Sequence, residues 1–167
     1  GATVGHGLGV TPATVWVLPR SDGDHRIASN WEVGVTAYSE ALKLNDTEAE
    51  GSSSGKVTAA SSTTFTLGSD VNVNGDTRTY LAYCFADVEG FSKFGTYVGN
   101  GDADGPFVHC GFKPRLIIIK STNAAEGWPM YDASINPYNS GTTTAMIQLF
   151  VNNSNAESAG SNENLDI

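Results

Sequence analysis

The sequence is a series of short apolar or alternating runs, each separated from the next by residues typical of turns. Clusters such as 21–24 and 99–106 are rich in Gly and Asp. Short strands between recurring turn signals are typical of an all-β sandwich or barrel. Gly, Ser, Thr and Asn make up 64 of the 167 residues, which favours turns and exposed strand faces over helices. We therefore predict strands at 14–18, 64–67, 78–85, 94–98, 116–120 and 145–151.

The sequence also resembles itself at a separation of about 102 to 107 residues. Gly-Val-Thr-Pro at 9–12 matches Gly-Phe-Lys-Pro at 111–114, and each is followed by a predicted strand. Further along, 44–50 matches 151–157. A repeat of this kind predicts that the same supersecondary unit occurs twice. We therefore predict an internal duplication of about 50 residues.

The duplication predicts how the whole chain is organised. We expect a single β-sandwich domain over 1–167, built from two related segments at about 5–57 and 107–167 and joined by 58–106. The stretch that follows the first copy has no counterpart after the second, so we expect the chain to be a piece of a longer array. Residues 36–44 fit a helix loosely, but they align with the strand pattern at 145–151, which favours a strand.

Charge and cysteine content exclude several classes of function. Nine Lys and Arg residues stand against eighteen Asp and Glu, giving a net charge of -9. An acidic chain repels phosphate backbones and anionic membranes, so we expect no nucleic-acid binding. No apolar run approaches the roughly 20 residues that a membrane span needs, so we expect no membrane insertion. Cys84 and Cys110 are too few for a disulfide scaffold or an unaided structural zinc site. A bridge between these two cysteines stays open but is not favoured.

One stretch of the sequence carries a resemblance to a known family. It begins Thr-Tyr-Leu-Ala-Tyr-Cys-Phe at 79–85, continues through Phe-Gly-Thr-Tyr-Val-Gly-Asn-Gly at 94–101 to Asp-Gly-Pro-Phe-Val at 104–108, and ends in the strand at 116–120. This stretch resembles a repeated β-domain in tail and other virion structural proteins of bacteriophages, especially marine ones. The first copy departs from that pattern, because its strand ends in Leu-Pro-Arg at 18–20 where the family has Lys.

The resemblance implies a fold, a location and partners. The implied fold is an antiparallel, jelly-roll or concanavalin-like β-sandwich, and the implied location is the extracellular phage particle. The implied partners are further copies of the chain, expected as a homotrimer, other virion proteins and host surface glycans. We expect a structural or adhesive domain of a tail fibre or appendage that serves assembly or host attachment. The alternatives are a carbohydrate-binding receptor-recognition module and, further off, a capsid decoration or head fibre.

Two loops suggest cation binding, and each has a simpler interpretation. Asn100, Asp102 and Asp104 place side-chain oxygens at alternate positions before a glycine, as at the start of a calcium loop. An EF-hand would need Glu at its twelfth position, where this chain has Gly111. An Asx-rich turn explains the same residues. The second loop, 72–76, contains Asn-Gly and is better explained as a hairpin turn.

Aromatic residues near turns form the candidate glycan site. Trp128 and Tyr138 lie beside prolines at predicted turns, where a ring can be exposed, and Tyr131 lies between them. Such rings stack on sugars, with Asp132 and Asn139 as polar partners. Packing within the core is the favoured alternative for all three rings.

We expect that the chain is not an enzyme. It contains no Gly-x-Ser-x-Gly, His-Glu-x-x-His or phosphate-loop motif. The best candidates for glycoside hydrolysis are the carboxylate pairs Asp87 with Glu89 and Glu48 with Glu50. Each pair is spaced to share one face of a strand, but each lies near a loop, where solvation or turn hydrogen bonds account for it.

Overall fold

Antiparallel strands account for nearly all the regular structure of the chain. The computed structural model describes residues 1–20, 27–30, 40–52, 55–102, 104–135, 146–159 and 165. The first elements are β1 Thr3–Gly5, β2 Thr14–Pro19, β3 Ile27–Asn30, β4 Glu40–Lys43, β5 Gly51–Ser52, β6 Val57–Ala60 and β7 Thr64–Leu67. The remaining elements are α1 Val71–Asn74, β8 Tyr80–Phe85, β9 Leu116–Ile118, β10 Pro129–Asp132, β11 Ile147–Phe150 and β12 Ser158–Ala159. The prediction of a mostly β, antiparallel fold is confirmed.

A five-stranded sheet in the order β5-β4-β3-β2-β8 forms the middle of the molecule. Strand β2 is apolar on both faces, because Val15 and Val17 alternate with Trp16 and Leu18 along it. Neighbouring side chains on a strand point to opposite faces, so β2 contributes to two different clusters. Strand β8 pairs with β2 over six residues, from Thr14 opposite Phe85 to Pro19 opposite Tyr80.

The first cluster forms where the five-stranded sheet meets a three-stranded sheet in the order β1-β7-β6. Its buried members are Val15, Val17, Ala41, Val57, Phe65, Leu67 and Val73. Helix α1 supplies Val73, and the Asp70 carboxylate caps this helix by accepting a hydrogen bond from the backbone N–H of Asn72 at 2.8 Å. The cluster is therefore shared by two sheets and one helix.

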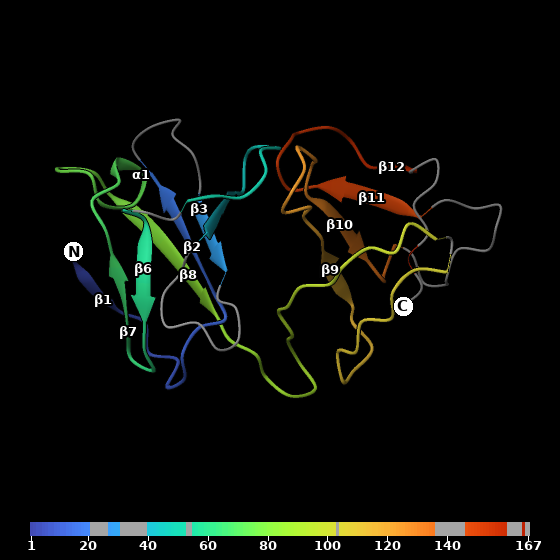
Figure 1. Cartoon of the computed structure of the whole chain (residues 1–167), viewed down its shortest axis with the longest axis horizontal. Helices are drawn as coiled ribbons and strands as arrows, with labels where there is room; N and C mark the ends of the chain where they lie inside the picture. The colour runs from blue at the N-terminus through green and yellow to red at the C-terminus, as the bar shows by residue number, and fades with distance from the viewer. Residues whose placement is uncertain are drawn as a thin grey trace.

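The second cluster joins the middle sheet to a four-stranded sheet in the order β12-β11-β10-β9. Leu42, Leu44 and Trp128 are buried here, and Trp16, Leu18 and Ile118 pack against them. The backbone N–H of Glu50 also donates to the carbonyl of Thr122 at 2.8 Å. Figure 1 shows the four-stranded sheet on the right and the other two sheets on the left.

The middle sheet and the four-stranded sheet each contain four strands that pair in the same sequential order. Strands β2, β3, β4 and β5 pair in sequence, and so do β9, β10, β11 and β12. The first two pairs of corresponding strands start 102 residues apart, at 14 and 116 and at 27 and 129. The last two pairs start 107 residues apart, at 40 and 147 and at 51 and 158.

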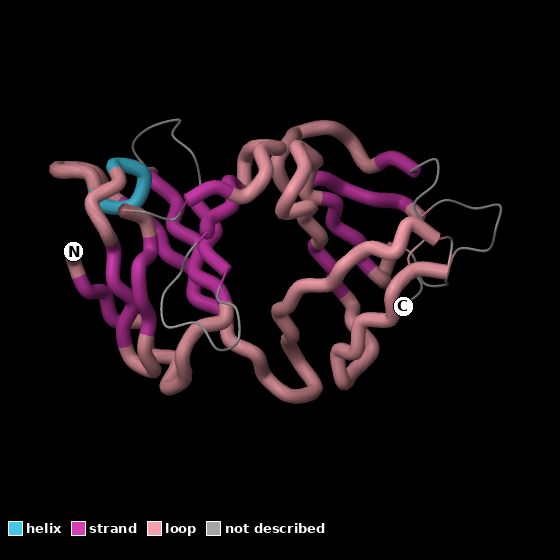
Figure 2. The backbone as a smooth tube through the Cα atoms, viewed as in Figure 1, coloured by secondary structure: helices cyan, strands magenta, loops and turns pink. Residues whose placement is uncertain are grey.

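Two local predictions are wrong. Residues 94–98 form no strand: they belong to the long connection between β8 and β9 that Figure 2 draws as loop. The hairpin predicted at 72–76 is instead the C-terminal end of α1 and the turn after it. The Asp70 cap explains the helix, because its carboxylate accepts a hydrogen bond from the backbone N–H of Asn72 in the first turn. In a hairpin, this N–H would need an acceptor on the partner strand. Among the described residues, no helix is long and apolar enough to cross a membrane.

Tyr80→Phe should lower the free energy of unfolding by about 1–2 kcal/mol. The Tyr80 hydroxyl accepts from the backbone N–H of Gly75 at 2.7 Å and donates to the Val71 carbonyl at 2.6 Å. Both hydrogen bonds tie α1 to β8, and the variant loses both. Urea unfolding followed by far-UV circular dichroism measures the change. Tyr83→Phe is the control: this ring is exposed, so a loss equal to that of Tyr80→Phe would contradict the assignment.

Candidate functional site

Trp128 lies immediately before β10, and its indole is in the core. The side chain is 5% exposed and packs in the cluster with Leu42 and Leu44. Its Nε1–H donates to the carbonyl of Lys43 at 2.9 Å, which satisfies the one polar group of the ring. Its backbone N–H donates to Asn152 Oδ1 at 2.8 Å. The ring therefore packs in the core, which is the interpretation favoured from the sequence, and in this structure it is not available to stack on a sugar.

Tyr131 is also buried, in the middle of β10. Its hydroxyl donates to Oε1 of Gln148 on β11 at 3.1 Å, and Gln148 is itself buried. A buried hydrogen-bonded pair of this kind stabilises the sheet. Tyr138 and Asn139, the other predicted members of the glycan site, lie outside the described residues. The predicted glycan site therefore has two buried rings, and its role in binding stays a prediction.

Asp132 ends β10 and is held ionised by its own turn. The backbone N–H of Ser134 donates to Asp132 Oδ1 at 2.6 Å. This bond lowers the pKa of the Asp132 carboxyl, and the Ser134 hydroxyl and the nearby charge of Arg115 lower it further. The carboxylate thus closes an Asx turn at the end of the strand.

The Asp132→Asn variant should lose stability at neutral pH relative to the wild type, and the difference should shrink in acid. The pKa of Asp132 is lowered by folding, so its contribution is complete above the usual aspartate pKa of about 3.9 and is lost as pH falls through the folded value. The urea midpoint measured between pH 7 and pH 2 tests this. Ser134→Ala, which keeps the backbone hydrogen bond, should flatten the curve only in part. Parallel curves for wild type and Asp132→Asn would contradict the assignment.

The predicted calcium loop has the hydrogen bonds of an Asx-rich turn. Asn100 Oδ1 accepts from the backbone N–H of Asp102 at 3.1 Å, and Asp102 Oδ1 accepts from that of Asp104 at 3.4 Å. The Asn100 amide in turn donates to the Asp104 carbonyl at 2.8 Å. Within the described part of the chain, no three His, Cys, Asp or Glu side chains gather in a way that could hold a metal ion. Calcium binding at this loop stays a prediction.

One carboxylate of each candidate catalytic pair forms an ion pair with a lysine. Asp87 pairs with Lys93 at 2.5 Å through Oδ2, and its Oδ1 accepts from the backbone N–H of Phe94 at 2.8 Å. Glu48 pairs with Lys43.

The thiols Cys84 and Cys110 are free, and burial raises the pKa of Cys84 so that it stays protonated at neutral pH.

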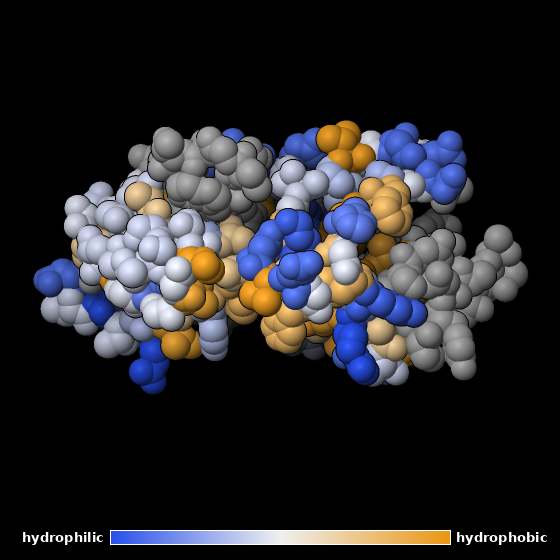
Figure 3. All heavy atoms as spheres, turned by 90° about the horizontal axis from the view of Figure 1, so that it is seen from below, coloured by the Kyte–Doolittle hydropathy of each residue, from blue (hydrophilic) through white to orange (hydrophobic). Residues whose placement is uncertain are grey.

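The connection between β8 and β9, residues 86–115, exposes large apolar side chains. Phe91 is 79% exposed and Phe107 is 90% exposed. The other exposed members are Val88, Tyr97, Val98 and Val108. The space-filling view from below shows apolar atoms near the middle of that face (Figure 3). A concentration of exposed apolar side chains on one segment is typical of an interaction surface.

The whole chain, residues 1–167, matches the family model described as Domain of unknown function (DUF7483). The chain belongs to the DUF7483 family. Comparison with curated proteins and with solved structures gives no match. The function of this DUF7483 domain therefore has to be argued from its own sequence and geometry.

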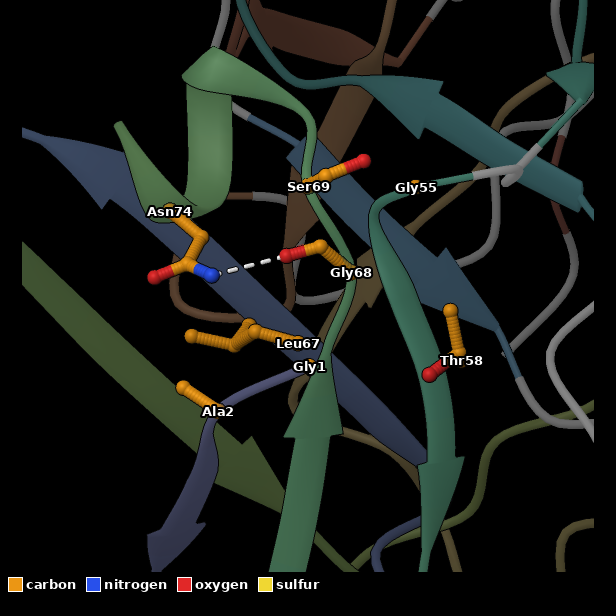
Figure 4. Close-up of a pocket in the computed structure, with 8 residues that line it drawn as sticks. All are labelled: Gly1, Ala2, Gly55, Thr58, Leu67, Gly68, Ser69 and Asn74. Carbon is orange, nitrogen blue, oxygen red and sulfur yellow. Dashed lines mark hydrogen bonds between the residues drawn. The ribbon is translucent and has the colours of Figure 1, made fainter. Parts of the chain in front are cut away.

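An open pocket of the DUF7483 domain lies beside its first residue. It is lined by Gly1, Ala2, Gly55, Thr58, Leu67, Gly68, Ser69 and Asn74 (Figure 4). The Asn74 amide donates to the Gly68 carbonyl at 2.8 Å across one wall. Most of the lining is small side chains and backbone, and none of its side chains is acidic, basic or a thiol. The pocket thus offers hydrogen-bonding groups but no side chain suited to acid–base or thiol chemistry.

The exposure of the apolar side chains in 86–115 was not predictable from the sequence. Residues 94–98 were predicted as a strand, which would have paired and half-buried Tyr97 and Val98. The Gly, Asp and Pro residues at 99–106 did signal an irregular connection. Neither signal shows that the apolar residues on both sides of this loop remain exposed.

Proposed function

We propose that this DUF7483 chain is a structural or adhesive domain of a bacteriophage virion, most specifically of a tail fibre or appendage, and that it acts by assembly and not by catalysis. The observation that carries the proposal is the exposed apolar surface of 86–115. Exposed patches of this kind mark surfaces that other proteins cover. The bacteriophage assignment is supported by the sequence resemblance, whose residues span the same segment.

The proposal includes an internal duplication and a sandwich-like core. The duplication is supported by the matching strand order of the two sheets and by strand starts that differ by 102 and then 107 residues. These separations agree with those of the matching sequence motifs. The sandwich is supported by the buried cluster shared by β2, β4, β6, β7 and α1, because two sheets contribute apolar residues to it.

Several features favour assembly over catalysis. Asp87 forms an ion pair with Lys93 in the same connection, and Glu48 forms one with Lys43, the last residue of β4. A general acid needs a carboxyl with a raised pKa, usually in an apolar pocket. The Asp132 carboxyl shows the opposite shift, to a lower pKa. These features fit an extracellular virion protein. Its partners would be further copies of itself, expected as a trimer, and other virion proteins.

Light scattering of the purified chain over a range of concentrations tests the proposal. We expect an oligomer that dissociates when Val98 and Phe107 are both replaced by serine. Thr66→Ser, a small change on β7 far along the chain from this surface, serves as the control and should leave the oligomer intact. A monomer at every concentration, with or without the serine substitutions, would count against assembly through this surface.

Recognition of host glycans is the second candidate function. The observation that favours it is the exposure of the aromatic rings of Phe91, Tyr97 and Phe107, two of which, Tyr97 and Phe107, flank the polar loop 99–106 in the sequence. Aromatic faces with nearby amide and carboxylate groups suit sugar stacking. A glycan array with the wild type and Tyr97→Ala separates the candidates. Specific binding that Tyr97→Ala abolishes would favour recognition, whereas an oligomer with no glycan binding would favour a scaffold.

A further inference from the structure

The outer edge of β9 exposes backbone hydrogen-bonding groups. The Arg115 carbonyl accepts from Ala133 N–H at 2.9 Å, and Ile119 N–H donates to the Pro129 carbonyl at 3.0 Å, so alternate residues 115, 117 and 119 bond to β10. In an antiparallel ladder the residues between them point the other way. The N–H and C=O groups of Leu116 and Ile118 therefore face the outer edge. Among the described residues, no strand pairs with this edge.

The corresponding edge of the first copy is occupied. Strand β2 corresponds to β9 at a separation of 102 residues, and its outer edge is covered by the six residues of β8. Arg20 N–H donates to the Thr79 carbonyl at 2.9 Å, so by alternation Thr14, Trp16 and Leu18 bond to β8. The positions corresponding to Thr14 and Trp16 are Leu116 and Ile118, whose groups face the open edge of β9. The two copies thus present the same hydrogen-bonding pattern, and one of them has a partner strand.

The exposure of the side chains and the charges near β9 are both consistent with β2 having a partner strand at this edge and β9 having none. Thr14, which pairs with Phe85 of β8, is 1% exposed, whereas the corresponding Leu116 is 54% exposed. Asp87 is the second residue after the end of β8. In the β2–β8 register, an equivalent strand on β9 would bring its Asp87 equivalent beside Arg115 and Lys113. Two cations at that end of β9 complement such a carboxylate.

We propose that the outer edge of β9 is a strand-acceptor site, and that its occupant is an unpaired extended segment of the same sequence type as β8, docked antiparallel. An extended segment that adds to a sheet edge gains main-chain hydrogen bonds and places alternate side chains on each face. The inference rests on the proposed duplication and is independent of the bacteriophage assignment. It identifies the kind of partner that joins copies of this repeat into a continuous array.

A peptide of residues 77–88 with Cys84 replaced by serine is the probe, used with the full chain. We expect saturable binding by fluorescence anisotropy, with amide exchange at Leu116 and Ile118 slowed at least about tenfold in the complex. Leu116→Pro should weaken binding at least about tenfold relative to Leu116→Ala, because both variants lose the side chain but only proline lacks the outward N–H. Proline is tolerated at the first residue of an edge strand, so the variant should fold.

Two N-methylated forms of the peptide test the same docking geometry with the unchanged protein, so this result does not depend on how the protein variants fold. N-methylation at Leu81 and Tyr83 blocks the edge that β8 turns toward β2 and should abolish binding. N-methylation at Ala82 and at the serine that replaces Cys84 blocks only the opposite edge and should leave binding within about threefold. Equal affinity of the two peptides, protection elsewhere than β9, or no binding at about 1 mM peptide would overturn the proposal.

A second folded copy is the other possible occupant, and light scattering identifies it. If Leu116→Pro dissociates an oligomer while the peptide fails to bind, a second copy occupies the edge and the proposal is wrong. The Val98 and Phe107 substitutions report separately on the surface of 86–115. Their failure to affect assembly would count against the proposed function without affecting the peptide result.

Discussion

Trp128→Ala should lower the free energy of unfolding by about 3–5 kcal/mol. The indole is 5% exposed and lies in the cluster that joins the middle sheet to the four-stranded sheet. Its removal leaves a cavity between Leu42, Leu44 and Ile118, and it leaves the Lys43 carbonyl without its donor. Both losses fall where the two sheets meet. Urea unfolding followed by far-UV circular dichroism measures the change without using tryptophan fluorescence.

Trp128→Phe separates packing from hydrogen bonding. Phenylalanine keeps much of the apolar ring but has no N–H for the Lys43 carbonyl, so we expect a smaller loss of about 1–3 kcal/mol. A loss below about 1 kcal/mol for Trp128→Ala would show that the indole is exposed in solution. That result would also return Trp128 to the candidate glycan site.

The packing partners of Trp128 were not predictable from its local sequence. Gly127 and Pro129 flank it, and both residue types signal a turn, where side chains are usually exposed. Its partner is the carbonyl of Lys43, 85 residues earlier in the chain. A contact between two sheets depends on how the sheets pack, and no periodicity in either segment specifies that packing. The sequence could therefore name the aromatic candidates and favour packing for them, but it could not specify the residues against which they pack.

Strands were predictable from the sequence where the local apolar pattern and the alignment of the two repeat copies indicated the same structure. Residues 14–18 form most of β2, because β-branched and apolar residues fill both faces of a strand that lies between two clusters. For 36–44 the helical and strand patterns compete, and alignment with 145–151 favours the strand. That preference is confirmed for Glu40–Lys43, which forms β4. Residues 36–39 lie outside the described part of the chain.

Residues 94–98 show where local pattern fails. Phe94, Tyr97 and Val98 have high strand propensity, but a strand needs a partner to satisfy its backbone. Here the N–H of Phe94 donates to the Asp87 carboxylate, and Val88 pairs with Ser92 in an isolated bridge. Local hydrogen bonds within 87–94 therefore replace pairing with a sheet. Competition of this kind between side-chain and ladder hydrogen bonds depends on the folded context.

Phe65→Ala should lower the free energy of unfolding by about 3–5 kcal/mol. Phe65 is 2% exposed on β7 and is the largest side chain among those that are fully buried. It packs in the cluster with Val15, Val57 and Val73, so its loss leaves a cavity shared by three elements. Urea unfolding at pH 7, with the slope of the transition compared between variants, measures the effect.

Phe91→Ala is the matched control, because it makes the same chemical change at a ring that is 79% exposed. A substitution on the surface should change the free energy of unfolding by no more than about 0.5 kcal/mol. Equal losses for the two variants would mean that the three-stranded sheet does not cover β2 in solution. A large loss for Phe65→Ala alone would place the apolar core between these sheets. It would also leave the exposed rings of 86–115 as surface that contributes little to the stability of the single chain and is therefore available for contacts with a partner.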